Sequence, residues 1–133
     1  MTVRRAADGA ATSEMLLARK DELASVLTDA LYEAHPEFAD RYGVVGRERC
    51  LQDMRYTLEH LAPSVALGEP RLFAQYVAWL VDLLRPRGIP PEHVGETMRV
   101  LERVLTSELN SEHIAAVQSS VAAGLAAVPR DGV

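Results

Sequence analysis

The sequence has 133 residues, a length that usually folds as one domain. Its 14 Lys and Arg residues against 19 Asp and Glu residues give a net charge of −5. The basic residues form no run, which argues against nucleic acid as a partner, since phosphate-binding surfaces need clustered cations. The single cysteine, Cys50, excludes an intramolecular disulfide and fits a reducing compartment. No stretch approaches the roughly 18 apolar residues of a membrane-spanning helix, so we expect a cytoplasmic protein with no membrane partner.

The chain begins with a small and polar stretch, 1–11, that we expect to be a disordered tail. Apolar residues then recur at helical spacing, which predicts one long helix from Ser13 to about Ala34. The dipeptide His35-Pro36 ends this helix, because the residue before a proline is kept out of helical geometry.

A short helical segment with Phe38 and Tyr42 follows, and Gly43 and Gly46 mark a turn after it. Pro63 is expected to kink or end the next helix, since a proline removes a backbone hydrogen bond. The apolar face of that helix consists of Cys50, Met54, Leu58, Leu61 and Val65.

Residues 72–84 show the strongest helical pattern, and 86–91 form a corner rich in proline and glycine. Two more helices are predicted around 94–105 and 114–128, separated by a stop at Asn110. Because no alternating strand pattern competes, we expect an all-α fold.

The predicted domain covers 12–128, and 129–133 is a second tail. Helices with such short connections either form a bundle or cross at about 50° around a ligand pocket, as in globins. Periodicity alone does not decide between the two arrangements.

Motifs for catalysis are missing from the sequence. It has no nucleophile motif and no glycine-rich phosphate loop, and its only lysine, Lys20, lies in a helical pattern. The histidines lie in separate segments without metal-binding spacing: His35, His60, His93 and His113. We therefore expect no catalytic residue, no bound metal ion and no enzymatic activity.

The densest group of polar residues surrounds the cysteine. At about 100° per residue, Asp53, Tyr56 and Thr57 fall on a helical stripe beside Cys50. Arg49 lies one turn from Asp53. Spacing alone favours a plainer interpretation, in which the thiol and Tyr56 are core residues and Arg49 forms a surface ion pair with Asp53.

A longer pattern consists of Cys50, Asp53, Tyr56, Leu58 and Gly68, preceded by the basic segment from Gly46 to Arg49. This pattern resembles the chromophore-attachment helix of phycobiliproteins, the globin-related antenna proteins that carry linear tetrapyrroles (bilins). The resemblance continues in Ala30–Pro36, in Tyr76 and in the turn Pro91–Val94, and it covers most of residues 20–110. It implies a globin-like helical fold.

Some residues depart from the antenna pattern. The stretch 1–11 stands where antenna members have an additional helical hairpin, and Gln52 replaces a frequent arginine. His93 and Val94 replace a frequent aromatic pair, and Pro63 interrupts a helix that is usually continuous. The sequence is thus most similar to the non-antenna relatives, the bilin biosynthesis-associated globins of non-photosynthetic bacteria.

The resemblance implies a protein that carries or shields a bilin, either biliverdin or a reduced linear tetrapyrrole. Asp53 would accept hydrogen bonds from the pyrrole nitrogens, while Arg47 and Arg49 would bind the propionates. Cys50, expected at a helix start near two arginines, would have thiolate character and form a thioether with a reactive bilin. The other implied pocket residues are Tyr56, Thr57, Tyr76 and His93. Bilin-synthesising enzymes are the implied protein partners, and a homodimer stays open.

Two other functions stay open at this point. The helices would pack solid in a ligand-free interaction or sensor domain, or would hold a haem with His60 or His93 as axial ligand. Otherwise, His60 and His113 are expected to face solvent. Trp79 lies off the main apolar stripe, so it is expected to pack against a neighbouring helix, and presentation to a partner is the alternative.

Overall fold

The computed structural model describes residues 2–130, with side chains from Gly9 onward. Among these residues there are six α-helices, one 3-10 turn and no strand, which confirms the all-α prediction. The elements are α1 (Thr2–Ala18), α2 (Lys20–Ala34), α3 (Glu37–Leu67), α4 (Pro70–Leu84), η1 (Arg85–Arg87), α5 (Pro91–Glu108) and α6 (Ser111–Ala126). Met1 and residues 131–133, which belong to the two expected tails, lie outside the described residues.

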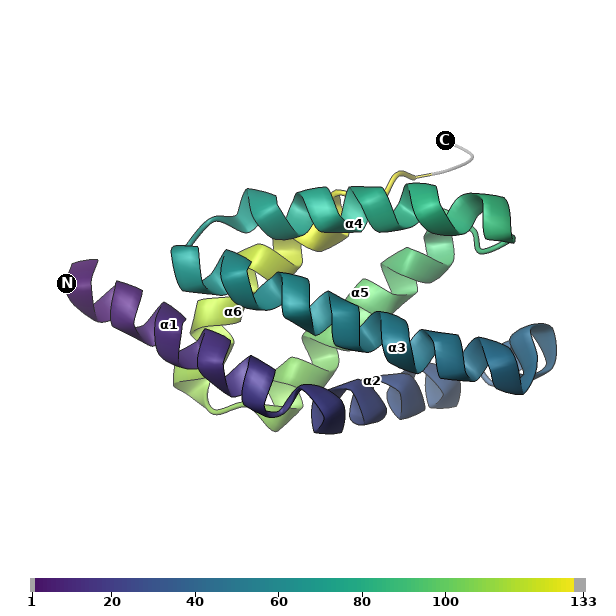
Figure 1. Ribbon diagram of the computed structural model, residues 1–133, viewed down its shortest axis with the longest axis horizontal. Helices are drawn as coiled ribbons and strands as arrows, with labels where there is room; N and C mark the ends of the chain where they lie inside the picture. Colours follow the sequence, from purple (N-terminus) through teal and green to yellow (C-terminus); the bar gives the residue numbers. More distant parts are fainter. Residues whose placement is uncertain (1, 131–133) are drawn as a thin grey trace.

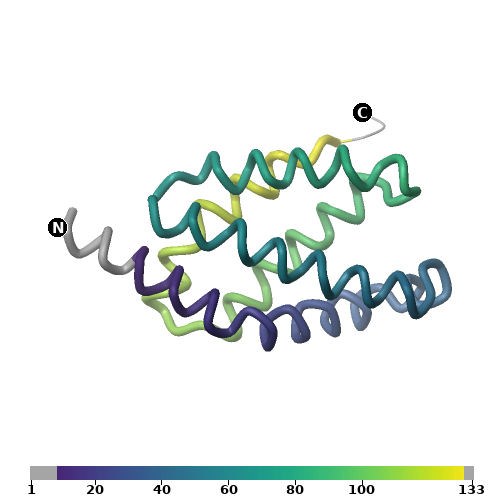
Figure 2. The backbone as a smooth tube through the Cα atoms, in the orientation of Figure 1, coloured from purple at the N-terminus to yellow at the C-terminus, as the bar shows by residue number. Residues whose placement is uncertain are grey.

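The helices are arranged in two layers. Helices α1, α2 and α3 lie on one side, α5 and α6 cross behind them, and α4 runs along the edge against α3 and α6 (Figure 1). The chain turns back sharply between α2 and α3, at the end of the molecule away from the N-terminus (Figure 2). All six helices contribute to one buried apolar core, which includes Leu16, Leu27, Leu58, Phe73, Met98 and Val117.

The start of the chain differs from the expectation. Helix α1 begins at Thr2, so the described part of the expected tail is helical. A Cβ on Gly9 would lie 2.7 Å from the carbonyl oxygen of Val65, so the missing side chain allows α1 to pack closely on α3. The buried Thr12 also contacts His113, with its Oγ1 2.6 Å from the imidazole Nδ1, so His113 is half-buried and not turned to solvent. Small residues carry no apolar periodicity, which is why the sequence does not predict this packing.

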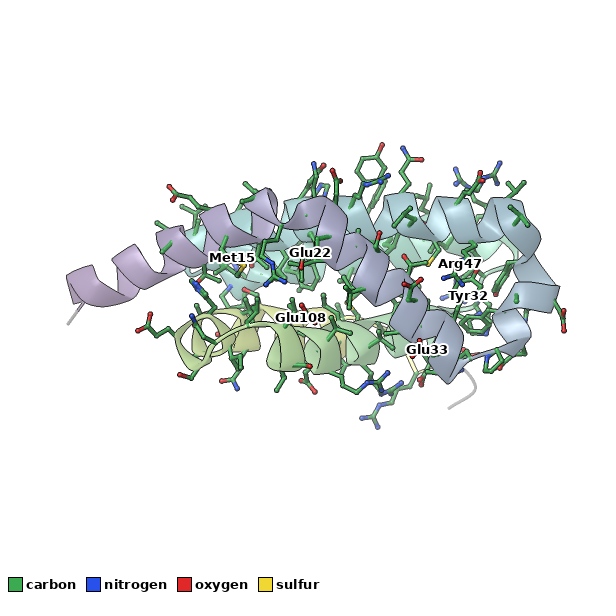
Figure 3. All side chains as sticks on the ribbon, turned by 90° about the horizontal axis from the view of Figure 1, so that it is seen from below. Met15, Glu22, Tyr32, Glu33, Arg47 and Glu108 are labelled. Atoms are coloured by element: carbon green, nitrogen blue, oxygen red, sulfur yellow. The ribbon has the colours of Figure 1, made fainter. Side chains whose placement is uncertain are left out.

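The helix expected from Ser13 to Ala34 is two helices in the structure. The chain bends at Arg19, which has φ −100° and ψ 15°. The Arg19 guanidinium lies 2.7 Å from Glu22 and 2.9 Å from Glu108, so this bend is tied to the end of α5. The two carboxylates approach each other between the layers (Figure 3).

Helix α3 carries most of the predicted site residues and is longer than expected. Gly43, with φ 69° and ψ −170°, interrupts it, while Gly46 is helical, so the expected turn is a single-residue break. The sequence predicts that Pro63 kinks or ends the helix, but it does not end it, because α3 continues to Leu67. Pro63 lies on the exposed side, where water can bind the carbonyl that loses its N–H partner.

The later boundaries agree with the sequence. Gly88, with φ 83°, completes the expected corner after α4, and α5 begins at Pro91. The side chain of Asn110 caps α6 by accepting a 3.2 Å hydrogen bond from the backbone N–H of His113. None of the helices in residues 2–130 combines the length and apolar character that a membrane crossing requires.

Candidate functional site

A cavity of about 600 Å³ lies between α3, α4 and the start of α5. This volume falls within the range of about 300–1,000 Å³ that is typical of small-molecule sites. Its walls combine aliphatic and aromatic side chains with a few polar groups. All but one of the predicted site residues line this cavity: Arg49, Cys50, Asp53, Tyr56, Thr57, Tyr76 and His93.

Helix α3 supplies the polar wall because of its register. Residues three, four and seven positions apart share one face of an α-helix, which brings Cys50, Asp53 and Thr57 to the cavity. Thr57 is buried, whereas Cys50 and Asp53 are half-buried. The predicted stripe of polar residues therefore faces an open space and not a solid core.

Asp53 is the most unusual group in this wall. Its carboxylate makes no hydrogen bond or ion pair with the residues that the structure describes, although it is half-buried. Burial raises the pKa of Asp53 above its ordinary value, and the charges of Arg87 and Arg49 act in the opposite direction. A half-buried carboxylate without a donor is costly, so this position favours a ligand that donates hydrogen bonds.

Thr57 and Tyr76 form a hydrogen-bonded pair across α3 and α4. The Thr57 hydroxyl lies 2.8 Å from the backbone carbonyl of Asp53 and 3.0 Å from the hydroxyl of Tyr76. Since the carbonyl only accepts, Thr57 donates its one proton there, and Tyr76 must donate to Thr57. The Tyr76 oxygen is left as an acceptor. Burial raises the pKa of Tyr76 to about 12, so this phenol stays protonated at neutral pH.

Two arginines extend the polar wall. Arg49 and Arg87 both line the cavity, and within residues 9–130 neither forms an ion pair with a carboxylate. The cavity therefore offers cations beside the acceptor oxygens of Asp53 and Tyr76. The sequence did not predict Arg87, because it lies in η1, where no helical face relates it to the other residues.

Arg47 is the predicted site residue that lies elsewhere. It forms an ion pair with Asp29 of α2 and stacks on Tyr32, with its guanidinium carbon 4.6 Å from the ring centroid (Figure 3). A second ion pair between α3 and α2 joins Arg55 to Asp21 at 3.0 Å. The sequence carries a sign of this arrangement, since the two aspartates are separated by the same number of residues as the two arginines.

Cys50 lines the cavity, but its expected thiolate character is wrong. The residue lies well inside α3, beyond the break at Gly43, so no helix N-terminus stabilises a negative charge there. Burial, and then the nearby charge of Asp53, raise the pKa of Cys50 to about 11. The thiol is therefore protonated at neutral pH and a weak nucleophile.

The mouth of the cavity is aromatic. Tyr56 is 46% exposed and Trp79 is 55% exposed, and both line the cavity. The expectation that Trp79 packs against a neighbouring helix is therefore wrong, as is the interpretation of Tyr56 as a core residue. His60 is exposed as expected, and its ring stacks on Tyr76 with 4.3 Å between centroids.

His93 closes another part of the cavity from the first turn of α5. Its Nδ1 lies 2.5 Å from the hydroxyl of Tyr42, which comes from the segment of α3 before Gly43. The sequence placed Tyr42 in a helix but not in the site, because the break at Gly43 shifts the helical register.

The donor set does not suggest a metal centre. Within the described residues, no three His, Cys, Asp or Glu side chains converge on a point where they could hold a metal ion. The cavity instead combines apolar surface with acceptor oxygens and two cations, which suits an organic ligand that has both N–H groups and acidic groups. No family model matches the chain, and no curated protein matches it in sequence.

Proposed function

We propose that this protein binds a linear tetrapyrrole, a bilin, in the cavity between α3, α4 and α5, and that it carries or shields the pigment without transforming it. The observation that carries the proposal is the unpaired, half-buried carboxylate of Asp53 in a cavity of about 600 Å³. The resemblance of this helix to the chromophore helix of phycobiliproteins supports the same ligand.

The chemistry of a bilin matches the acceptors in the wall. Its pyrrole rings present several N–H groups along one edge, and these require acceptor oxygens once they leave water. Asp53 supplies a charged acceptor, and the Tyr76 oxygen supplies a neutral one. A carboxylate at the pyrrole nitrogens also favours the protonated form of the pigment.

The acidic groups of a bilin require cations. Two propionates extend from the central rings, and Arg49 with Arg87 are available to bind them. In this proposal Arg87 takes the role that the resemblance gave to Arg47, whose guanidinium is occupied by Asp29. The flat apolar body of the pigment would lie against the aromatic side chains at the mouth.

The raised pKa of Cys50 supports a non-covalent complex, because thioether formation needs a thiolate. The globin-like arrangement stays part of the proposal, as does the kinship with the non-antenna phycobiliprotein relatives. Bilin-synthesising enzymes are the proposed source or recipient of the pigment.

The cavity argues against a ligand-free interaction domain, in which the helices would pack without such a space. One observation keeps haem as a second candidate ligand. His93 lines the cavity, and its Nε2 has no hydrogen-bond partner within the described residues, so it would coordinate an iron atom if its proton moved to Nδ1. In haem, however, the four pyrrole nitrogens bind the iron and offer no N–H to Asp53. Haem would leave that carboxylate unpaired, so the bilin is the better fit.

Titration of the purified apoprotein with biliverdin and with a reduced bilin tests the proposal. We expect about one pigment per chain, a red-shifted and sharpened absorption band, and induced circular dichroism. The same pigments mixed with the urea-unfolded chain provide the control. Pigment spectra that stay as they are in buffer would refute the proposal, and a Soret band on haem titration would favour the second candidate.

A further inference from the structure

Tyr42 and His93 form a close pair at one end of the cavity. The hydroxyl of Tyr42 lies 2.5 Å from Nδ1 of His93, and the two rings are nearly perpendicular, at 85°, with 5.9 Å between centroids. Both residues line the cavity. They come from different elements, α3 before its break and the first turn of α5, so the contact depends on the tertiary fold.

The direction of this hydrogen bond follows from the two groups. Burial raises the pKa of Tyr42, so the phenol keeps its proton. Burial, and then the charge of Arg41, lower the pKa of His93, so the imidazole is neutral near pH 7. Of the two, the phenol is the stronger acid and the imidazole the stronger base, so Tyr42 donates and Nδ1 accepts.

A neutral imidazole carries its single proton on one nitrogen. If Nδ1 accepts from Tyr42, the proton must be on Nε2. Nε2 makes no hydrogen bond with the described residues, and no buried polar side-chain atom among them lacks a partner, so Nε2 is not buried. Because His93 lines the cavity, its N–H is a donor in the same lining as the acceptors Asp53 and Tyr76.

The neighbouring groups keep this donor neutral. Phe38 contacts His93, with 4.6 Å between ring centroids and 42° between the ring planes, and it stacks with His35 at 4.9 Å. Arg41 and His35 oppose a positive charge on His93, whereas Glu37 and Glu92 favour it. The carboxylate of Glu96 lies 3.1 Å from Nε2 of His35 and is engaged there.

We propose that Tyr42 is a positioning residue that holds His93 as the Nε2–H tautomer, and that this N–H donates to a carbonyl oxygen of the bound ligand. The inference rests on the proposed function and extends it. A bilin carries a lactam carbonyl on each terminal ring, so His93 would select the end of the pigment that lies toward α5. Haem has no lactam carbonyl, and an imidazole with its proton on Nε2 does not coordinate iron through that nitrogen.

The tautomer can be measured without any ligand. Imidazole ¹⁵N NMR of the apoprotein near pH 7.5 should show His93 with the proton on Nε2. Tyr42→Phe should shift His93 toward a mixture of tautomers. His60 is an internal control with the opposite tautomer, because its Nδ1 lies 2.8 Å from the backbone carbonyl of Tyr56 and must donate. A proton on Nδ1 of His93 in the native chain would overturn the inference, whatever the ligand.

The second measurement uses biliverdin. Tyr42→Phe should weaken biliverdin binding roughly two- to tenfold, the range of one neutral hydrogen bond. It should also raise the lactam carbonyl stretching frequency in the vibrational spectrum, a change that lost packing alone would not cause. His93→Leu removes the donor and should raise the lactam carbonyl frequency. His93→Gln keeps an N–H donor and should therefore raise this frequency less. His113→Gln, outside the cavity, should behave as the native chain.

The outcomes separate the two proposals. If the native chain binds biliverdin but Tyr42→Phe changes neither affinity nor the carbonyl frequency, the positioning role is wrong and the proposed function stands. If the native chain binds no bilin, the proposed function fails and takes the ligand contact of His93 with it. An unfolded Tyr42→Phe protein would be recognised by circular dichroism, and the His93→Gln and His93→Leu pair then decides the contact.

Discussion

Gly124 of α6 lies so close to Phe73 of α4 that a Cβ on the glycine would be 2.6 Å from two carbons of the phenyl ring. Phe73 is fully buried and stacks on Tyr76 with 5.9 Å between centroids. The close approach of α4 and α6 thus sets the position of the cavity wall that Tyr76 forms.

Substitution of Gly124 by alanine tests this contact. We expect Gly124→Ala to destabilise the protein by about 1–3 kcal/mol, because the added methyl group forces the ring or the helix to move. Gly95→Ala is the matched control, since its Cβ would be 3.6 Å from Val128 and alanine favours a helix by roughly 0.5–1 kcal/mol. Urea unfolding followed by circular dichroism measures both. Equal stability of the two variants would contradict the proposed close contact.

The charge of Asp53 should lower the stability of the apoprotein. Its pKa is raised in the folded chain, so the folded state holds a proton that the unfolded state has already lost above the ordinary value of 3.8. The free energy of unfolding therefore falls as the pH rises from 3.8 toward the raised pKa, and stays lower above it. Asp53→Asn should remove this part of the pH dependence and melt at an equal or slightly higher temperature at pH 7.

The same substitution should change the pigment. Without the carboxylate, a bound bilin should absorb at shorter wavelength and lose its proton at lower pH. Asp82→Asn, on the exposed side of α4, is the control for charge alone. A strongly destabilised Asp53→Asn apoprotein with an unaltered bilin spectrum would show instead that Asp53 has a structural role and does not contact the ligand.

Cys50 should react slowly. A pKa of about 11 in place of 9.0 lowers the thiolate fraction at pH 8 by on the order of a hundredfold, so alkylation by iodoacetamide should be slow in the folded chain and fast in urea. A bound bilin should leave the native chain in denaturant, as it leaves Cys50→Ala. Pigment that migrates with the denatured native chain, and not with the variant, would show a thioether.

Variants of Arg87 and Arg47 provide a matched test of ligand binding, because Arg87 lines the cavity and Arg47 does not. Arg87→Gln should weaken biliverdin binding by about 10- to 100-fold, since hydrogen bonds to a charged group contribute about 1.5–3 kcal/mol. Arg47→Gln should leave binding within about twofold, because Arg47 lies outside the cavity and contacts Asp29. Equal losses in the two variants would indicate a general effect of charge and not a contact at Arg87.

The helical faces could be predicted where a single helix determines them. Cys50, Asp53 and Thr57 share a face by spacing alone, and the structure places that face on the cavity. Arg47 shows the limit of this reasoning. At about 100° per residue it lies about 60° to one side of Cys50, while Asp53 lies as far to the other, so one of them had to face away.

Residues brought together by the tertiary fold could not be found in this way. Tyr42 precedes the break at Gly43, and that break changes which side of the chain faces the core. Arg87 lies in a turn whose direction depends on the contacts of α4 and α5. Gly9 packs against a backbone carbonyl. This contact requires that residue 9 has no side chain, so the pattern of apolar and polar side chains does not predict it.

Trp79 gives the molecule a built-in optical reporter. It is the only tryptophan in the chain, and it lies half in solvent at the mouth of the cavity. Its indole emits in the near ultraviolet, where a linear tetrapyrrole absorbs, so a pigment seated against it would accept its excitation energy. The intensity and lifetime of this one emitter would then report occupancy of the cavity in dilute solution, without a label and before any colour is visible.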